Sequence, residues 1–321
     1  AVDAGYGTLA ERATADRTRV FLKIQEGCNT FCTYCIIPYG RGPSRSLDIA
    51  DAVARARDLV ETGAREIVLT GTNIGEHEDL DRLVAALLEK TTIERLRISS
   101  LDPSQITPFL FRLAEEEARF CPHFHVSLQS PLTRILKLMK RGYTTSEVVA
   151  CLERLGSIRP IGNGSGGVFV GMDLITGFPG ESGKDFAETL ALLEKLPWTR
   201  LHVFPHSERA GTPATRMSGK LDPTERKKRA AALMDLSLAR YQRVLRQVLN
   251  ETETSGNLVQ VLVEAKLKTG WWSGHTSNYL RCLWKDDGQD SPERNSFVML
   301  SPSDLLVDRS AGEVALLSSI V

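Results

Sequence analysis

Three cysteines, Cys28, Cys32 and Cys35, fall within eight residues at the spacing C-x3-C-x2-C. Disulfides need pairs, so three thiols this close suit a single metal centre better. Structural zinc sites usually close with four ligands, and no fourth Cys or His stands here at zinc-finger spacing. Cysteine thiolates also hold iron–sulfur clusters. Three thiolates on a cubane cluster would leave one iron open to a substrate or cofactor.

The remaining cysteines and several histidines offer no comparable pattern. Cys121, Cys151 and Cys282 are scattered along the chain with no shared spacing, and we expect buried structural thiols. His77, His202 and His206 also lack ligand spacing. We interpret these histidines as packing or surface residues.

The composition is that of an ordinary globular protein. Of the 321 residues, 42% are hydrophobic and 25% charged, which is enough for a sizeable core. Lys plus Arg equals Asp plus Glu at 40 each, so any nucleic-acid contact must come from a local patch. No run approaches the roughly 18 apolar residues of a membrane span, and residues 1–16 lack the apolar core of a secretory signal. We therefore expect no membrane partner and a cytoplasmic protein with reduced thiols.

Apolar strands alternating with helices must position the cysteine loop. This alternation predicts a parallel sheet in an α/β fold, and right-handed crossovers favour a partial (β/α)6 barrel. Ligands of such folds bind at the C-terminal ends of the strands, where Thr70, Gly71 and Gln129 join the cysteine loop. The predicted strands are 20–24, 66–71, 96–100, 124–129, 168–176 and 201–204, and the predicted helices are 48–62, 80–89, 104–120, 133–140, 146–155 and 184–196.

The pattern changes after residue 222. A long helix is predicted over 223–251, and Ser255-Gly256-Asn257 ends it. Strands without intervening helices then predict a small antiparallel barrel of about 65 residues. Its predicted strands are 259–263, 279–284, 296–300 and 314–317.

Basic and aromatic residues of this C-terminal part could contact RNA phosphates and bases. They are Arg226, Lys227, Lys228, Arg229, Arg240, Arg243 and Arg246 on the long helix, with Lys266, Lys268, Trp271, Trp272, Arg281 and Lys285 beyond it.

With the cysteine loop after the first strand of a β/α barrel, the chain resembles the radical S-adenosylmethionine superfamily, and within it the methylthiotransferase subgroup. The motifs that carry the resemblance are KIQEGCN (23–29), CIIP (35–38), SLQS (127–130), LKLMKRGYT (136–144) and DLITGFPGE (173–181). The segments IVLTGTNIG (67–75) and RISSL (97–101) are most similar to the branch that acts on N6-threonylcarbamoyladenosine in tRNA. The chain's end, GHTSNY (274–279), looks like the family's RNA-binding TRAM barrel.

The resemblance implies a [4Fe–4S] cluster on Cys28, Cys32 and Cys35, with S-adenosylmethionine on its open iron. It implies a ring at Tyr34 that stacks on the adenine, and Gln129 and Arg141 for the methionine carboxylate or ribose. The implied cofactor-binding residues are Tyr34, Thr70, Gly71, Gln129, Arg141 and Asp173.

The resemblance also implies transfer of a methylthio group to N6-threonylcarbamoyladenosine next to the anticodon. The expected partners are a tRNA anticodon stem-loop and an electron donor protein. Two alternatives stay open: a methylthiotransferase for isopentenyladenosine tRNA or a ribosomal protein, and a non-catalytic RNA-binding protein with a structural metal site.

We expect a linker or remnant over 1–18, a radical SAM domain over 19–252 and a TRAM-like RNA-binding domain over 256–321. Members of the family carry a further N-terminal domain whose three cysteines hold a second cluster, and this sequence does not include it. Pro131-Leu132 replaces the usual Gly-Ser, and residues 162–167 lengthen a loop. We therefore expect the isolated chain to cleave S-adenosylmethionine without completing methylthiolation.

Overall fold

The computed structural model describes residues 18–161, 166–285, 291–308 and 311–321. The expected linker over 1–18 therefore lies outside the described residues except for its last position. Most of the lengthened loop over 162–167 also lies outside them.

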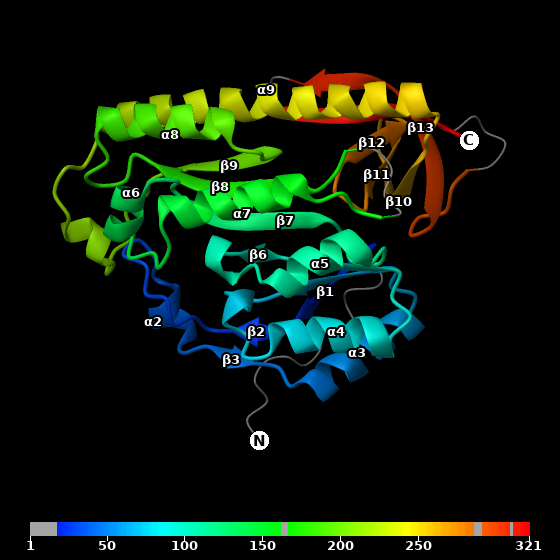
Figure 1. Cartoon of the computed structure of the whole chain (residues 1–321), viewed down its shortest axis with the longest axis horizontal. Helices are drawn as coiled ribbons and strands as arrows, with labels where there is room; N and C mark the ends of the chain where they lie inside the picture. The colour runs from blue at the N-terminus through cyan, green and yellow to red at the C-terminus, as the bar shows by residue number, and fades with distance from the viewer. Residues whose placement is uncertain (1–17, 162–165, 286–290, 309–310) are drawn as a thin grey trace.

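Parallel strands form the partial barrel that the sequence predicts (Figure 1). One sheet has the order β1-β4-β5 and the next has the order β6-β7-β8-β9, and every pairing within them is parallel. Only Ser99 separates β5 from β6, so the second sheet continues the first. The bounds are β1 Arg19–Lys23, β4 Glu66–Thr70, β5 Arg95–Ile98, β6 Ser100–Leu101, β7 His123–Gln129, β8 Phe169–Thr176 and β9 Arg200–Pro205.

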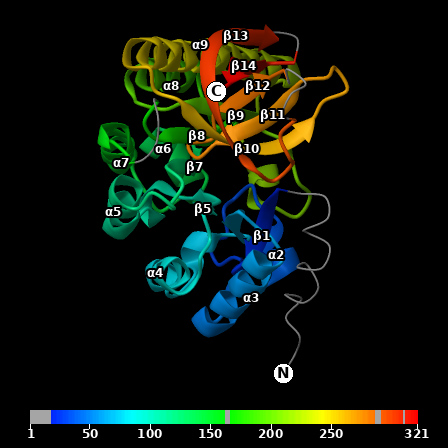
Figure 2. The same ribbon diagram turned by 90° about the vertical axis from the view of Figure 1, so that its right-hand side faces the viewer.

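Helices cover the outer side of the strands, and Figure 2 shows α3, α4, α5 and α7 there. Their apolar faces join the strands in one buried core. Helix starts follow their caps: Asp48 caps α3, while Thr144 and Ser182 form capping boxes on α7 and α8. The bounds are α3 Ile49–Glu61, α4 Leu80–Lys90, α5 Pro108–Glu116, α6 Thr133–Leu138, α7 Thr145–Ser157 and α8 Gly183–Lys195.

The single helix predicted over 104–120 is wrong. A short 3-10 helix, η2 (Pro103–Gln105), comes first, and α5 starts at Pro108 under the side-chain cap of Thr107. Proline at the first helical position is pre-set for such a start. Beyond α5, Phe120 turns into the core and bridges to Leu96.

Helix α9 (Pro223–Ser255) leads to a small closed barrel in the order β10-β11-β12-β14-β13. Gly256 ends the helix in a left-handed cap, as its position predicts. The barrel is antiparallel except for β12 and β14, which pair in parallel, and strand β11 was not predicted. The bounds are β10 Val259–Lys266, β11 Trp272–Thr276, β12 Arg281–Trp284, β13 Phe297–Asp308 and β14 Glu313–Ile320.

The two barrels are joined by polar contacts, among them those of Arg95, and by α9, which runs along both of them (Figure 1). The guanidinium of Arg95 on β5 donates to the carbonyls of Gln260 and His275, each at 3.0 Å. On α9, Leu233 belongs to the larger core and Leu245 to the core of the small barrel. Among the described helices, none combines the length and apolar character that a membrane crossing needs.

Candidate active site

The three clustered cysteines lie on the loop at the C-terminal end of β1, which is the expected end of the sheet. This loop leaves the short strand β2 (Gln25–Glu26), passes through helix α2 (Ile37–Arg41) and returns at β3 (Arg45–Ser46), which pairs with β2. All three thiols are free; the Cys32 residue is buried, and Cys28 and Cys35 are partly exposed. The loop therefore presents three thiols at the strand-end rim.

Gln25 anchors the base of the cysteine loop from a fully buried position. Its Nε2 donates to the carbonyl of Gly27 and to Oγ of Ser44, each at 2.8 Å, and its Oε1 accepts from the N–H of Asn73 at 2.8 Å. Gly71 makes this approach possible, because a Cβ there would lie 2.7 Å from the Gln25 carbonyl oxygen. Gly71 thus acts on the cysteine loop through Gln25.

Glu76 holds the outer part of the loop. It ends the 3-10 helix η1 (Ile74–Glu76) and accepts from the N–H of Asn29 at 2.9 Å and from Oγ1 of Thr30 at 2.8 Å. The Thr30 N–H in turn donates to Sγ of Cys28 at 3.5 Å. Sequence reasoning missed Gln25 and Glu76 as site residues. Gln25 lies within the motif KIQEGCN (23–29), but nothing in the motif marks it as the anchor of the loop, and a lone Glu carries no spacing signal.

Arg141 lies directly against the cysteine site. Its Nη1 donates to Sγ of Cys32 at 3.2 Å, its Nε donates to the Tyr143 hydroxyl at 3.1 Å, and it forms an ion pair with Asp102. Burial alone would lower the pKa of Arg141, but the facing Tyr143 and Asp102 raise it above its usual value. A permanent positive charge therefore stands beside Cys32.

Tyr34 is partly buried between the cysteines and the core beneath them. Its ring meets the Phe178 ring edge-on, with centroids 6.3 Å apart. Burial, with the nearby Cys32, raises the pKa of the Tyr34 hydroxyl, so it stays neutral. The ring is positioned by packing against Phe178, and its contact with an adenine remains a prediction.

The other predicted site residues are spread over two levels of the barrel. Thr70 ends β4, and its carbonyl accepts from the Ile24 N–H at 2.9 Å. Gln129 ends β7 with φ at 60°, a left-handed conformation that is uncommon for a residue other than glycine. Asp173 lies deeper and accepts a hydrogen bond from Nε2 of His125 at 2.9 Å. The structure thus brings Tyr34 and Arg141 to the cysteines, and Asp173 to a separate group.

This second group consists of His125, Asp173 and His202, on β7, β8 and β9. Their ligand atoms all lie within 4.8 Å of one another, and Asp173 pairs with His202 in register. Burial and the neighbouring His125 lower the pKa of His202, so its ring is neutral near pH 7. Two imidazoles and one carboxylate form a donor set that can coordinate a divalent metal.

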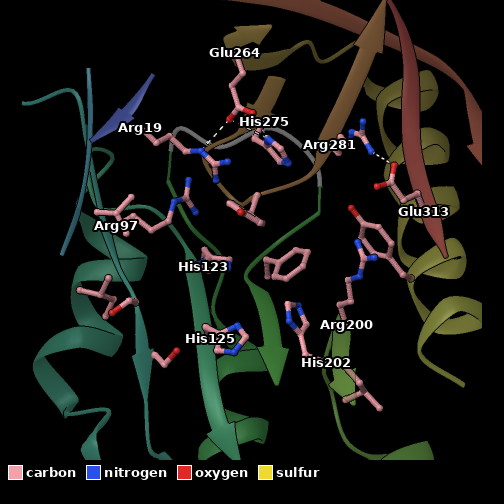
Figure 3. A pocket seen from close by; sticks show the side chains of 18 of the residues that line it. Arg19, Arg97, His123, His125, Arg200, His202, Glu264, His275, Arg281 and Glu313 are labelled. Atoms are coloured by element: carbon pink, nitrogen blue, oxygen red, sulfur yellow. Dashed lines mark hydrogen bonds and ion pairs between the residues drawn. The ribbon is translucent and has the colours of Figure 1, made fainter. Parts of the chain in front are cut away.

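A cavity of about 1130 Å³ lies between the two barrels and reaches from β1 and β9 to the small barrel (Figure 3). Its two carboxylates are already paired: Glu264 contacts Arg19 and His275, each at 3.0 Å, and Glu313 contacts Arg281. Ser99 and Ser100 extend the cavity toward the strand ends. Its basic lining consists of Arg19, Arg97, His123, His125, Arg200, His202, His275, Arg281 and Arg294.

Three arginines of the predicted basic face of α9 have structural roles instead. Arg229 is buried and paired with Glu181 at 2.6 Å. Arg226 donates to the His206 carbonyl at 2.7 Å, and Arg240 lies 4.5 Å from the Trp198 ring centroid. These three side chains hold α9 onto the barrel.

The three cysteines outside the cluster are buried, as expected. Burial raises the pKa of Cys121 to about 11 and those of Cys151 and Cys282 to about 12.

Comparison with known proteins gives a consistent result. The family model described as "Radical SAM superfamily" matches residues 22–193, more than half of the chain. The Bacillus subtilis protein "Threonylcarbamoyladenosine tRNA methylthiotransferase MtaB" is 36% identical over 291 residues, which cover 87% of this chain and 62% of that protein. The Aquifex aeolicus protein of the same name is 39% identical over 229 residues, with 70% and 54% covered.

A differently named relative matches at a similar level. The Sphingopyxis alaskensis "tRNA-2-methylthio-N(6)-dimethylallyladenosine synthase" is 34% identical over 275 residues, with 82% of this chain and 59% of that protein covered. The chain spans less than two thirds of the length of each of these relatives.

Among solved structures, Escherichia coli coproporphyrinogen III oxidase, described as a radical SAM enzyme, has a TM-score of 0.51 at 15% identity. The match covers 83% of this chain and 69% of that one. At this identity the likeness shows a shared fold.

Proposed function

Because the chain belongs to the radical SAM superfamily, as the match over residues 22–193 shows, we propose that Cys28, Cys32 and Cys35 hold a [4Fe–4S] cluster and that the chain cleaves S-adenosylmethionine. The observation that carries this proposal is the presence of three free thiols on one loop at the C-terminal end of β1. That end is where β/α barrels bind their ligands.

The spacing of the sulfurs fits a cluster better than a single ion. Among the described residues, the group whose ligand atoms lie within 4.8 Å of one another is His125, Asp173 and His202. The three cysteine sulfurs are therefore more widely spread. Two thiolates on one zinc ion lie about 3.8 Å apart, since each Zn–S bond is about 2.3 Å and the geometry is tetrahedral. A wider set of thiolates suits an iron–sulfur cluster.

The residues around the thiols have separable roles. A cluster held by Cys28, Cys32 and Cys35 would supply the electron for reductive cleavage of a carbon–sulfur bond of S-adenosylmethionine. Arg141 donates a hydrogen bond to Sγ of Cys32 and offers its charge to the methionine carboxylate. Asp102 and Tyr143 keep that guanidinium in place. Tyr34, which packs against Phe178, offers its ring to the adenine.

The proposed substrate is a tRNA anticodon stem-loop carrying N6-threonylcarbamoyladenosine, which receives a methylthio group. Two relatives named for this activity support the proposal. The small barrel adds cation–aromatic pairs suited to RNA: the Nζ of Lys266 lies 5.3 Å from the Trp272 ring centroid, and the Nζ of Lys285 lies 5.1 Å from that of Trp271. We propose a catalytic unit over 19–252 and a TRAM-like RNA-binding unit over 256–321.

A tRNA carrying dimethylallyladenosine is the second candidate substrate, because the Sphingopyxis relative is named for it. An electron donor protein and a cytoplasmic location complete the proposal, since the cleavage needs a low-potential electron and the thiols must stay reduced.

Anaerobic reconstitution tests the central claim. The chain should bind about four iron atoms and release 5′-deoxyadenosine from S-adenosylmethionine under reduction. Cys32→Ala should lose both properties. A chain that binds zinc and no iron would instead be an RNA-binding protein with a structural metal site. Gel-shift binding to anticodon stem-loops, compared with binding to a ribosomal protein, separates the substrate classes.

A further inference from the structure

We propose that the cavity between the barrels recognises the carboxylate of the threonylcarbamoyl group, with Arg97 and Arg200 as its specificity-determining residues. This inference rests on the proposed function, because it says how the site would select its modified nucleotide. It concerns the part of the nucleotide that distinguishes it from the dimethylallyl form, which carries no charge.

The first support is the charge of the cavity. Five arginines line it, against Glu264 and Glu313, which are already paired. Behind the lining, Glu66 is paired with Arg97. A cavity lined by an excess of fixed cations attracts an anion. The same excess of positive charge disfavours a divalent metal on His125, Asp173 and His202, since His125 and His202 also line the cavity.

The second support is an incomplete set of hydrogen bonds on Arg97. Its side chain is 3% exposed, and its Nε donates to Glu66 at 2.7 Å. Among the described residues, its Nη1 and Nη2 have no hydrogen-bond partner, although the Tyr279 ring centroid lies 4.9 Å from the guanidinium carbon. Nδ1 of His123, on a neighbouring part of the lining, is also buried without a partner. A carboxylate takes two parallel N–H donors from one guanidinium, and displacement of the Tyr279 ring would open that edge to a ligand.

Arg200 faces Arg97 from the opposite wall of the cavity (Figure 3). Its Nη2 donates to the Gly312 carbonyl at 3.1 Å, and its guanidinium carbon lies 5.2 Å from the Tyr241 ring centroid. Within the described residues, no carboxylate lies within 4.0 Å of the Arg200 guanidinium nitrogens. Its charge is therefore available to an anion in the cavity.

The third support is the depth of Arg97 in the barrel relative to the rim at the strand ends. Arg97 pairs with Val68, and Val68 pairs with Phe21, so these residues form one level of the barrel. The rim residue Thr70 lies two positions further along the strand, a rise of about 7 Å. A base held at the rim beside the cysteines could therefore extend its N6 substituent down to Arg97.

Binding to matched RNAs tests the inference. Three anticodon stem-loops of one sequence would carry N6-threonylcarbamoyladenosine, its carboxyl methyl ester or N6-dimethylallyladenosine. We expect the chain to bind the acid about tenfold more tightly than the ester, as one charged bidentate contact supplies about that factor. Arg97→Lys and Arg200→Gln should each bring this ratio toward one. Arg112→Gln removes an exposed charge of α5 outside the cavity and should leave the ratio unchanged.

Each alternative result has a distinct meaning. Equal binding of acid and ester by the unaltered chain overturns the inference, and so does an unchanged ratio in both cavity variants. Equal weakening for all three RNAs means that the arginines bind backbone phosphate, which also overturns it. Release of 5′-deoxyadenosine is measured separately, so a chain that cleaves S-adenosylmethionine yet ignores the carboxylate retains its proposed chemistry. If circular dichroism shows Arg97→Lys to be unfolded, the inference is judged by the binding ratio of Arg200→Gln and by the comparison of acid and ester in the unaltered chain.

Discussion

The Nη1 of Arg141 donates a hydrogen bond of 3.2 Å to Sγ of Cys32. This contact joins the turn after α6 to the cysteine loop, and the ion pair with Asp102 adds the segment after β6. One guanidinium thus links three segments that are far apart in the sequence. A side chain in this position influences both the thiolate and anything bound next to it.

Arg141→Lys should therefore lower the rate of 5′-deoxyadenosine release by about tenfold or more. A lysine keeps the charge but loses the planar fork that contacts Asp102, Tyr143 and Cys32 together. Asp102→Asn should cause a smaller loss of the same kind, and the double variant should lose less than the sum of both, since the residues share one interaction. Additive effects would mean that Asp102 does not position Arg141.

Iron content should depend on the clustered cysteines alone. Cys28→Ala, Cys32→Ala and Cys35→Ala should each lose the visible absorption and most of the iron after reconstitution, because the proposed cluster needs all three thiolates. Cys151→Ala is the matched control, since the Cys151 thiol is buried on α7 and has a raised pKa. Loss of iron in that control would contradict the assignment.

Gly71→Ala should lower the free energy of unfolding by about 1–3 kcal/mol, the usual cost of overpacking. The added Cβ would lie 2.7 Å from the Gln25 carbonyl oxygen and 2.9 Å from its Oε1. The cysteine loop rests on Gln25, so iron binding should weaken as well. Gly183→Ala is the control, because a Cβ at the start of α8 meets nothing within 4 Å. Urea unfolding of both variants measures the difference.

The buried pair of Glu66 and Arg97 predicts a defined pH dependence. Burial alone would raise the pKa of Glu66, but the charge and hydrogen bond of Arg97 lower it below its usual value near 4.5. A lowered pKa in the folded state stabilises the fold above pH 4.5, and this stabilisation is lost as the pH falls through the lowered value.

Glu66→Gln should therefore cost about 3 kcal/mol near neutral pH, since it leaves Arg97 buried and unpaired. The difference between the variant and the unaltered chain should shrink as the pH falls through the lowered pKa of Glu66, where its carboxyl group becomes neutral. Urea unfolding at several pH values tests this. Glu115→Gln breaks the more exposed pair with Arg154 and should change stability little at any pH. A difference for Glu66→Gln that is independent of pH would rule out the ionised pair.

Much of the fold is visible in the sequence because each strand of the larger barrel is a short apolar run bounded by turn residues. The missed strand β11 shows where this fails. Gly274 lies in its middle, and a glycine there suggests a break. The structure needs that glycine, because a Cβ would lie 2.1 Å from the Leu262 carbonyl oxygen. The helix predicted over 104–120 failed for the opposite reason, since its apolar spacing continued past Pro108, where α5 in fact starts.

The candidate site likewise contains residues that could be predicted from the sequence and residues that could not. The cysteines could be found from their spacing, and Arg141 from the motif that contains it. Asp102, Glu76 and His125 could not, because each is one polar residue on a separate element. Only strand register and the turns after the strands bring them to their partners. His202 looked like a packing or surface residue and instead lies beside His125 and Asp173.

Helix α9 has 33 residues, so its axis is about 50 Å long at a rise of 1.5 Å per residue. Its Ser237 Oγ accepts from the Leu201 N–H at 2.8 Å on the larger barrel, while Leu245 and Val248 are buried in the small one. A hinge between two barrels needs a connection that can bend, and a continuous helix packed into both provides none. An RNA anchored on the small barrel would therefore stay at a constant distance from the cysteine loop, so selection of a nucleotide by its position along the RNA would follow from the rigidity of the protein.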